Sequence, residues 1–209
     1  MRARPLLTLA LIASATLLGA LRLNAGGEGE GAQQPSPEEM AEMMKRWQAA
    51  CTPGEPHQWL AQFVGTWDTS MKMYMGGPGT PAMESKGTAE TRWLVEGKWL
   101  SMESAIAMMN MPVKQFGTLG YDNFKKKFVQ SYVDSMGTAL YTAEGLRDRT
   151  GTVLTLYGEM DEPMTGEHDK LVKYVLRILG KDKLVIEIHD LAIGEPNTMV
   201  VETTYTRKK

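Results

Sequence analysis

Beyond residue 64, the chain is a series of short segments that alternate apolar and polar residues, separated by turn-forming residues. The first segment has side chains of one face at every second position: Trp67, Thr69, Met71 and Met73. This period of two is typical of a strand with one buried face. Further segments have the same strand character: 85–95, 98–108, 115–121, 128–135, 140–145, 153–160, 171–179, 184–193 and 198–207.

The links between these segments are short and contain Gly, Asp and Asn, for example Glu96-Gly97 and Asp122-Asn123. Links of this length join antiparallel neighbours and leave no room for crossover helices. An open sheet of about ten strands would leave two unpaired edges, which closure removes. The sequence therefore predicts a mainly β protein, an antiparallel up-and-down β-barrel of about ten strands over residues 65–209.

The first 25 residues have the pattern of a targeting segment. Arg2 and Arg4 precede an uncharged, mostly apolar run over residues 6–21, and the small Ala25 suits a cleavage position. The run is shorter than the about 20 apolar residues that a membrane-spanning helix needs. We therefore expect a signal peptide over 1–25 and an exported product, periplasmic or secreted, with no stable membrane insertion after cleavage. An uncleaved anchor is the alternative.

Residues 26–36 are rich in Gly and Glu and have no apolar period, which predicts a flexible linker. A helical segment over 37–64 follows. Ser36 and Glu39 form a capping box, with Pro37 at the first helical position. One helix face has an apolar stripe, at Met40, Met43, Met44 and Trp47. We expect this stripe to dock on the barrel or, in an interaction protein, on a partner chain.

Charge and cysteine content exclude several classes of protein. Lys and Arg number 23 against 25 Asp and Glu, so the chain lacks the basic excess that nucleic-acid binding requires. Cys51 is the single cysteine, which leaves no intramolecular disulfide. In an oxidising compartment a lone cysteine is buried and inert, modified, or paired with another chain, and burial is the commonest of these fates. The alternative is a Cys51–His57 pair in which the histidine activates the thiol as a nucleophile.

The segment Phe63-Val64-Gly65-Thr66-Trp67 places Gly-x-Trp where a short helix meets the first strand. This arrangement resembles the opening of lipocalin-like barrels, in which the Trp closes one end and an Arg near the last strand packs over it. The resemblance implies a cation–π contact between Trp67 and Arg207, worth about 1 kcal/mol when partly buried. We expect this contact to seal the barrel and to perform no reaction.

Longer segments extend the resemblance: 52–60 (TPGEPHQWL), 65–67 (GTW), 117–123 (GTLGYDN), 158–160 (GEM) and 205–208 (YTRK). On these residues the chain resembles, from residue 38 to residue 209, a bacterial family known as domain of unknown function 1579. The resemblance implies a calycin-like barrel and brings no established activity with it.

Large apolar and aromatic side chains on the predicted strands are the candidate lining of a ligand cavity. We expect a small apolar or amphipathic molecule to bind there, in contact with Met71, Met73, Trp93, Trp99, Glu103, Tyr121 and Tyr132. The carboxylate of Glu103 is the candidate for reading a polar group of the ligand. No catalytic residue, cofactor or metal is assigned, and the oligomeric state stays open.

Other functions stay open as well. In small barrels of the nitrobindin type, which the predicted fold resembles, a strand histidine binds haem. Here His189 alternates with the apolar face formed by residues 184, 186 and 188, so we expect it on the outside. Two methionine groups are candidate Cu(I) ligands, Met71-x-Met73-x-Met75 and Met108-Met109-Asn110-Met111. Alternate strand residues lie about 6.6–6.8 Å apart, which disfavours three sulfurs of the first group on one ion, whereas a loop before Pro112 could bring those of the second together. The remaining alternatives are an enzyme that uses Glu103 or His57 and a structural protein without a ligand.

Overall fold

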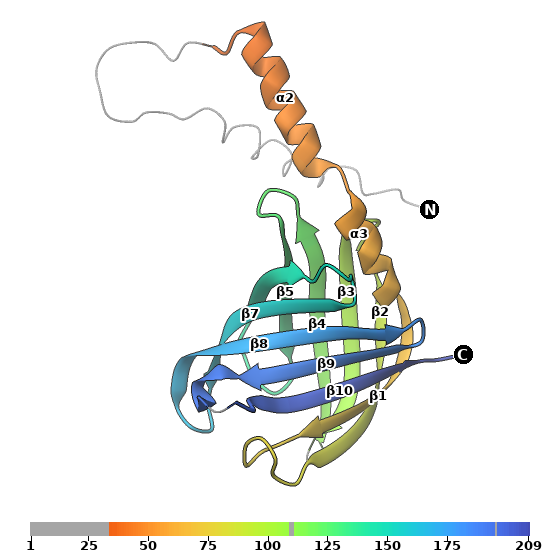
Figure 1. Ribbon diagram of the computed structural model, residues 1–209, viewed down its shortest axis with the longest axis vertical. Helices are drawn as coiled ribbons and strands as arrows, with labels where there is room; N and C mark the ends of the chain where they lie inside the picture. Colours follow the sequence, from red (N-terminus) through yellow and green to blue (C-terminus); the bar gives the residue numbers. More distant parts are fainter. Residues whose placement is uncertain (1–33, 109–110, 195) are drawn as a thin grey trace, which may run out of the picture. The chain divides into compact units, whose positions relative to one another are not determined.

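Figure 1 shows a computed structural model of the 209-residue chain, which describes residues 34–108, 111–194 and 196–209. The chain divides into two units, residues 1–46 and residues 47–209. The predicted signal peptide, residues 1–25, lies outside the described residues. No helix in the described ranges is long and apolar enough to cross a membrane.

Helix α2 (Pro37–Cys51) begins at the predicted capping box. The Ser36 N–H donates to Glu39 Oε2 at 2.8 Å, and the Glu39 N–H donates to Ser36 Oγ at 3.2 Å. Two backbone donors at the helix start therefore have partners. None of the residues of α2 is buried, and its apolar stripe is exposed at Met40, Met43, Met44 and Trp47. The docking of this stripe stays a prediction.

Ten strands form a closed antiparallel barrel, which confirms the predicted fold (Figure 1). They are β1 (Gly65–Met73), β2 (Met83–Val95), β3 (Trp99–Met108), β4 (Met111–Asp122), β5 (Lys127–Asp134), β6 (Tyr141–Arg147), β7 (Val153–Glu162), β8 (Glu167–Gly180), β9 (Lys183–Asp190) and β10 (Met199–Arg207). Each strand pairs with its neighbours in chain order, and β10 closes the barrel by pairing with β1. A short 3-10 helix, η2 (Leu191–Ile193), links β9 to β10.

One end of the barrel is plugged by the helical turns before β1. These turns are α3 (Glu55–Leu60) and η1 (Ala61–Phe63), and their buried apolar side chains are Trp59, Leu60 and Phe63. All three belong to the first core cluster, which fills the adjacent part of the barrel. Trp59 also donates from Nε1 to the carbonyl of Gly151, in the turn between β6 and β7, at 2.7 Å. We call this the α3 end.

The first and last strands meet in the contact expected from the Gly-x-Trp motif. The guanidinium carbon of Arg207 lies 4.1 Å from the ring centroid of the buried Trp67. Arg207 also donates from Nη1 to the Val64 carbonyl at 2.6 Å and from Nη2 to the Gln62 carbonyl at 3.1 Å, at the end of η1. Gly65 has a φ of +143°, and a Cβ there would lie 2.1 Å from Arg207 Nη1. Glycine is therefore required where the chain enters β1.

The opposite end of the barrel is rich in methionine. A second core cluster there consists of Met71, Ile106 and Val113, with Met73, Met108 and Val201 packed against it. Cross-strand pairs join Met73 to Met83 and Met108 to Met111. We call this the methionine end, defined by Met73, Met83, Met108 and Met111. The high methionine content of the chain, 16 residues, is thus partly explained by one end of the barrel.

The last turn of α2 is held by a loop side chain of the barrel. Asn123, in the turn after β4, donates from Nδ2 to the carbonyl oxygens of Ala49 (3.3 Å), Ala50 (3.1 Å) and Thr52 (2.7 Å). Cys51 lies in this turn and is exposed, so the expectation of a buried thiol is wrong. The physical reason is that the turn is fixed through its backbone carbonyls and buries none of its side chains.

Candidate functional site

A cavity of about 150 Å³ lies in the barrel interior, between the two core clusters. Its wall includes Phe63, Leu176 and Leu184 of the first cluster. On the side of the methionine end it includes Met71 and Val201. A space of this size accommodates a molecule of about one ring, since an apolar cavity of about 150 Å³ binds benzene.

A buried amide interrupts the apolar wall. Gln130 is only 8% exposed and lines the cavity. Among the described residues, Ser101 Oγ is the one buried side-chain polar atom without a hydrogen-bond partner, so the amide of Gln130 keeps access to the cavity. A polar molecule in the cavity can therefore form hydrogen bonds with this amide.

Tyrosine hydroxyls form the other polar part of the wall. The hydroxyl oxygens of Tyr132 and Tyr174 are 3.2 Å apart, and the Tyr132 ring stacks on Tyr141 with 4.7 Å between centroids. Burial raises the pKa of both Tyr132 and Tyr174, and it raises the pKa of Tyr205 to about 12. All three side chains are therefore neutral at physiological pH and can donate or accept hydrogen bonds without carrying charge.

Strand register brings these groups together. Gln130 and Tyr132 occupy alternate positions of β5, so both point to the same face, into the barrel. Tyr132 lies opposite Gly117 of β4, where a Cβ would be 3.1 Å from the Cβ of Tyr132. Gly117 and the small Ala89 of β2 are both part of the wall. Their lack of side-chain bulk leaves the space that the cavity occupies.

The wall is nearly free of charge. In the part of the chain that the structure describes, its lining contains no Lys, Arg or His. Glu103 is its one acidic residue, but the carboxylate pairs on the outer face with Arg92, Oε1 to Nη2 at 2.5 Å, and these side chains are 46% and 55% exposed. Burying an ion without a partner in a protein costs on the order of several kcal/mol. The cavity therefore suits a neutral molecule.

The predicted ligand-binding residues fall in different parts of the barrel. Met71 and Tyr132 line the cavity. Met73 packs at the methionine end against the second core cluster. Trp93 and Tyr121 pack against the first core cluster instead, and the Tyr121 ring meets His57 of α3 at 5.5 Å between centroids.

Trp99 and Glu103 take outward positions on β3. Leu100 is fully buried and belongs to the first core cluster, so its neighbour Trp99 points away from the interior. The Trp99 ring covers Gly120 of β4, where a Cβ would lie 2.3 Å from Cε3 of the ring. Glu103 follows the same alternation, which takes its carboxylate to Arg92 rather than to a ligand.

Several wall residues are not among those predicted from the sequence: Thr91, Met102, Gln130, Tyr174, Thr203 and Tyr205. A signal for Gln130 is present in the sequence, because Phe128, Gln130 and Tyr132 recur with a period of two. A glutamine in that pattern is readily taken as solvent-facing, whereas the apolar residues on both sides of it place it inside.

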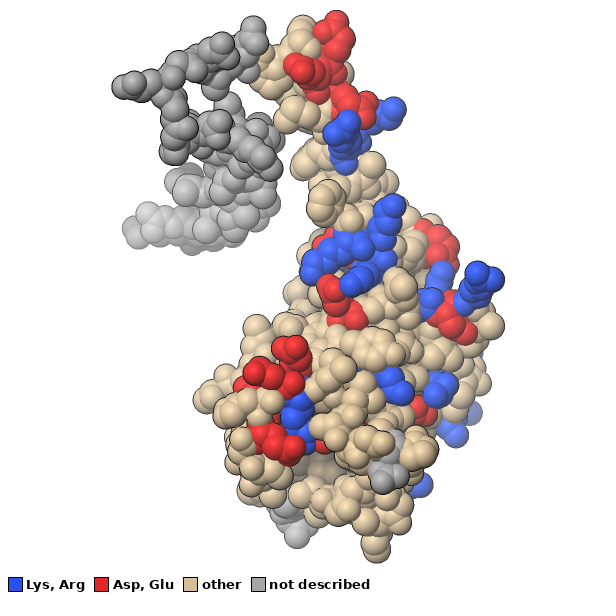
Figure 2. All heavy atoms as spheres, turned by 60° about the vertical axis from the view of Figure 1, so that its left-hand side comes forward, with Lys and Arg blue, Asp and Glu red and all other residues tan. Residues whose placement is uncertain are grey.

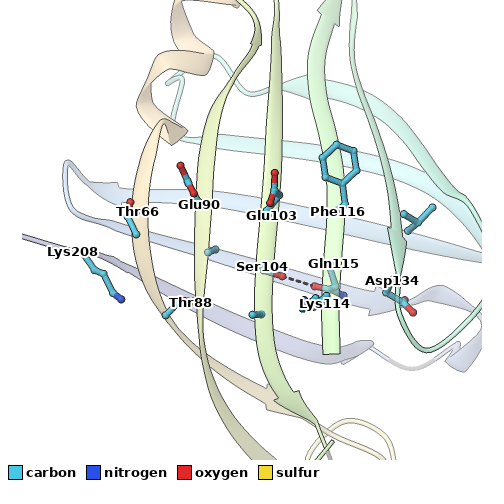
Figure 3. Close-up of a pocket in the computed structure, with 13 residues that line it drawn as sticks. Thr66, Thr88, Glu90, Glu103, Ser104, Lys114, Gln115, Phe116, Asp134 and Lys208 are labelled. Carbon is cyan, nitrogen blue, oxygen red and sulfur yellow. Dashed lines mark hydrogen bonds between the residues drawn. The ribbon is translucent and has the colours of Figure 1, made fainter. Parts of the chain in front are cut away.

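A larger, open hollow of about 490 Å³ lies on the outer face of β1 to β5. Figure 3 shows its charged side chains, which are of both signs: Glu90, Glu103, Lys114, Asp134 and Lys208. The same view shows the hydrogen bond between Ser104 Oγ and Gln115 Oε1, at 3.1 Å. Charged groups in an open hollow are solvated, so the interior cavity is the better candidate for an apolar molecule.

Acidic and basic side chains are also interspersed on the barrel face in Figure 2. Neighbouring side chains of opposite charge form ion pairs on the barrel surface. Glu144, for example, accepts from Lys125 Nζ at 3.0 Å and from Lys127 Nζ at 2.5 Å. Exposed pairs of this kind contribute little stability, about 0–1 kcal/mol each.

His57, which is buried, and His189, which is partly buried, lie away from the cavity. His189 is on the outer face of β9, with Nε2 3.3 Å from Glu187 Oε2 and Nδ1 3.1 Å from Thr198 Oγ1. His57 lies in α3, where Nδ1 accepts a hydrogen bond from the Gly54 N–H at 3.0 Å. The cavity wall thus offers no imidazole to a haem iron, and a one-ring space is too small for a haem. Among the described residues, no three His, Cys, Asp or Glu side chains are grouped to hold a metal ion.

Comparison with known proteins agrees with this fold. The family described as "Protein of unknown function (DUF1579)" matches residues 52–207, more than half of the chain. No curated protein matches. Among solved structures, Rv2717c from M. tuberculosis is 16% identical, with a TM-score of 0.54, and the match covers 76% of this chain and 100% of that chain.

Redesigned β-barrels match with lower TM-scores. The barrel b11L5F_LGL is 11% identical with a TM-score of 0.39, over 71% of this chain and 94% of that chain. The barrel mFAP1, bound to DFHBI, is 10% identical with a TM-score of 0.38, over 74% of this chain and 100% of that chain. Of these likenesses, the one to the M. tuberculosis protein supports the fold and nothing further.

Proposed function

The chain belongs to the DUF1579 family of proteins of unknown function, and we propose that it is an exported barrel protein that binds one small, mostly apolar molecule in its interior. The observation that carries the proposal is the cavity of about 150 Å³ between two core clusters. Protein interiors are packed closely and contain few voids larger than a water molecule. A one-ring space with a mostly apolar wall therefore supports a binding role.

The methionine end is the proposed entrance. The α3 end is plugged by Trp59, Leu60 and Phe63, whose side chains are buried in the first core cluster. At the other end, Met71 belongs both to the cavity wall and to the second core cluster. Methionine side chains are unbranched and adapt their shape easily. Rotation of Met71 and its neighbour Met73 would open a path without moving a strand.

Methionine methyl groups provide a direct test with toluene as the probe. Met71 and Met102 line the cavity, whereas Met40 and Met43 lie on α2. Toluene should shift the methyl NMR signals of Met71 and Met102 saturably, because an aromatic ring perturbs the nuclei beside it. The signals of Met40 and Met43 should stay in place. Shifts of all methionines in proportion to concentration, or no shift at all, would contradict binding in the cavity.

A pair of alanine variants separates the interior from the outer face. Ala89→Leu adds bulk inside the cavity, because Ala89 is a buried part of its wall. Ala105→Leu is the matched control on the exposed face of β3. We expect Ala89→Leu to remove toluene binding while the protein stays folded, and Ala105→Leu to bind toluene as the unchanged protein does. Toluene binding retained in a folded Ala89→Leu variant would contradict this site.

Export is supported by the first 25 residues, where Arg2 and Arg4 precede the apolar run 6–21. Residues 1–36 fused to alkaline phosphatase test this part of the proposal. That reporter needs disulfides, which form outside the cytoplasm, so an exported fusion should be active. A matched fusion without residues 6–21 should be inactive. Equal activity in the two fusions, or none in either, would contradict export.

A further inference from the structure

Gln130 is a polar group of the cavity wall. The side chain is 8% exposed, and its amide keeps access to the cavity. Across the strands it lies opposite Leu119 and Ala143, which are both buried apolar residues. A primary amide supplies two N–H donors and one carbonyl acceptor. Because Gln130 belongs to the cavity wall, a molecule in the cavity is within its reach.

The Tyr132–Tyr174 pair supplies a second hydrogen-bonding group in the same wall. When one hydroxyl donates to the other across 3.2 Å, the accepting hydroxyl keeps its own O–H free to donate. Tyr132 follows Gln130 by two positions, so their places on β5 are about 6.6–6.8 Å apart. A ligand hydroxyl between them can accept a hydrogen bond from a tyrosine O–H and donate its own O–H to the Gln130 side-chain carbonyl.

We propose that the cavity selects a neutral one-ring molecule with a single hydroxyl group, a simple phenol in chemical class, and that Gln130 recognises the hydroxyl. This inference rests on the proposed function and specifies the ligand. The volume of about 150 Å³ limits the ligand to about one ring. The neutral wall disfavours a carboxylate, because its charge would be buried without a cation. The amide in the wall disfavours a pure hydrocarbon, which offers Gln130 no hydrogen-bond partner.

A matched pair of ligands tests the selectivity of the unchanged, full-length protein. In p-cresol and p-xylene the same ring carries a hydroxyl or a methyl group of similar size at one position. We expect p-cresol to bind about fivefold to tenfold more tightly in NMR titrations, the effect of one buried hydrogen bond. Benzoate, with a charge on a single ring, should not bind at the same concentrations.

Substitutions at Gln130 test its role. Gln130→Met and Gln130→Leu remove the amide and place an apolar side chain of similar size at this position. We expect the Kd values for p-cresol and p-xylene to become equal within about twofold in both variants. Urea unfolding should show that both variants stay folded, because an apolar side chain of similar size replaces one side chain of the cavity wall. Gln58→Met is the matched control, since Gln58 is exposed on α3 and is not part of the cavity wall. That variant should keep the preference for p-cresol.

The outcomes separate this inference from the proposed function. Equal binding of p-cresol and p-xylene to the unchanged protein would overturn the inference and leave the cavity as a binding site for hydrocarbons. A preference for p-cresol that persists in the Gln130 variants would overturn the role of that residue. If neither ligand, nor toluene, shifts the signals of Met71 and Met102, the proposed function fails, and the inference fails with it.

Discussion

Arg207, on the last strand, and Trp67, on the first, are held face to face, with 4.1 Å between the guanidinium carbon and the ring centroid. The same guanidinium donates to the carbonyls of Gln62 and Val64 at the end of η1. One side chain thereby joins β10, β1 and the helical plug. Closure of the barrel and docking of the plug are therefore coupled through Arg207.

We expect Arg207→Ala to lower the free energy of unfolding by about 2–3 kcal/mol, because it removes the cation–π contact and the hydrogen bonds to the carbonyls. Arg207→Lys should lose nearly as much, since a lysine cannot reproduce the planar fork of donors. Urea unfolding measures both effects. Lys208→Ala is the control, because the side chain of Lys208 forms an exposed ion pair with Asp68 at 3.2 Å and its backbone hydrogen bond to Thr66 is kept in the variant. An Arg207→Lys variant as stable as the unchanged protein would show that the charge alone suffices.

Gly65→Ala should destabilise the protein by about 2 kcal/mol, through its φ of +143° and the close approach to Arg207. Part of this loss should disappear in the Arg207→Ala background, where the guanidinium that the new Cβ would meet is gone. A double-mutant cycle in urea therefore should give a coupling energy of about 1 kcal/mol between positions 65 and 207. Strict additivity would show that backbone conformation accounts for the whole effect.

Alkaline pH should weaken the fold through the buried tyrosines. The pKa of Tyr205 is raised by burial from 10 to about 12, so the unfolded chain ionises first as the pH rises. The contribution of buried, neutral Tyr205 to the free energy of unfolding is therefore fully present below pH 10 and is lost between about pH 10 and pH 12. Unfolding in urea across this range measures the loss. Tyr205→Phe should reduce it, because the buried ionisable hydroxyl is removed. An unchanged pH profile in Tyr205→Phe would contradict this assignment.

Acid should weaken the α3 end through His57. Burial lowers the pKa of His57 below the usual value of 6.5, so the unfolded chain binds the proton more readily than the folded one. The contribution of neutral His57 to the free energy of unfolding is therefore present above pH 6.5 and declines as the pH falls from there toward the lowered pKa. His57→Asn keeps an acceptor for the Gly54 N–H and should flatten this decline in urea unfolding. His189, whose pKa is also lowered by burial, should contribute a second part of it.

Gln58→Asn is the control for the acid experiment, because Gln58 lies beside His57 in α3, is exposed and does not titrate. This variant should leave the dependence of stability on pH between 7 and 5 unchanged. The same decline in His57→Asn as in the unchanged protein would mean that other groups cause the acid sensitivity.

The strands are predictable from the sequence because burial on one face imposes a period of two. Segments such as 153–160 and 184–193 carry this pattern clearly, and both correspond to strands of the barrel, β7 and β9. The short turns make the neighbours antiparallel, which in turn makes closure the natural solution. The same alternation correctly places His189 on the outer face, opposite to Ile188.

The cavity is harder to predict, because its wall depends on which residues leave space. Trp99 is large and apolar and looks like a lining residue, yet it covers Gly120 on the outside while Leu100 takes the interior position. The space itself is left by two small residues of the wall, Ala89 and Gly117. Small residues give no signal of a cavity in a sequence. Which strands face each other across the barrel, as those of Tyr132 and Tyr174 do, follows only from the closed three-dimensional arrangement.

The pairing of β1 with β10 also sets the order in which the protein can be completed during synthesis. Hairpins from β1 to β9 can form while the chain is still being translated, because each pairs with the strand before it. The barrel itself stays incomplete until residues 199–207 have left the ribosome. Until then Trp67 lacks the cover of Arg207, and the carbonyls of η1 lack its guanidinium. Strands β1 to β9 therefore form an open sheet until β10 is available, and the pairing of β10 with β1 and β9 closes the barrel.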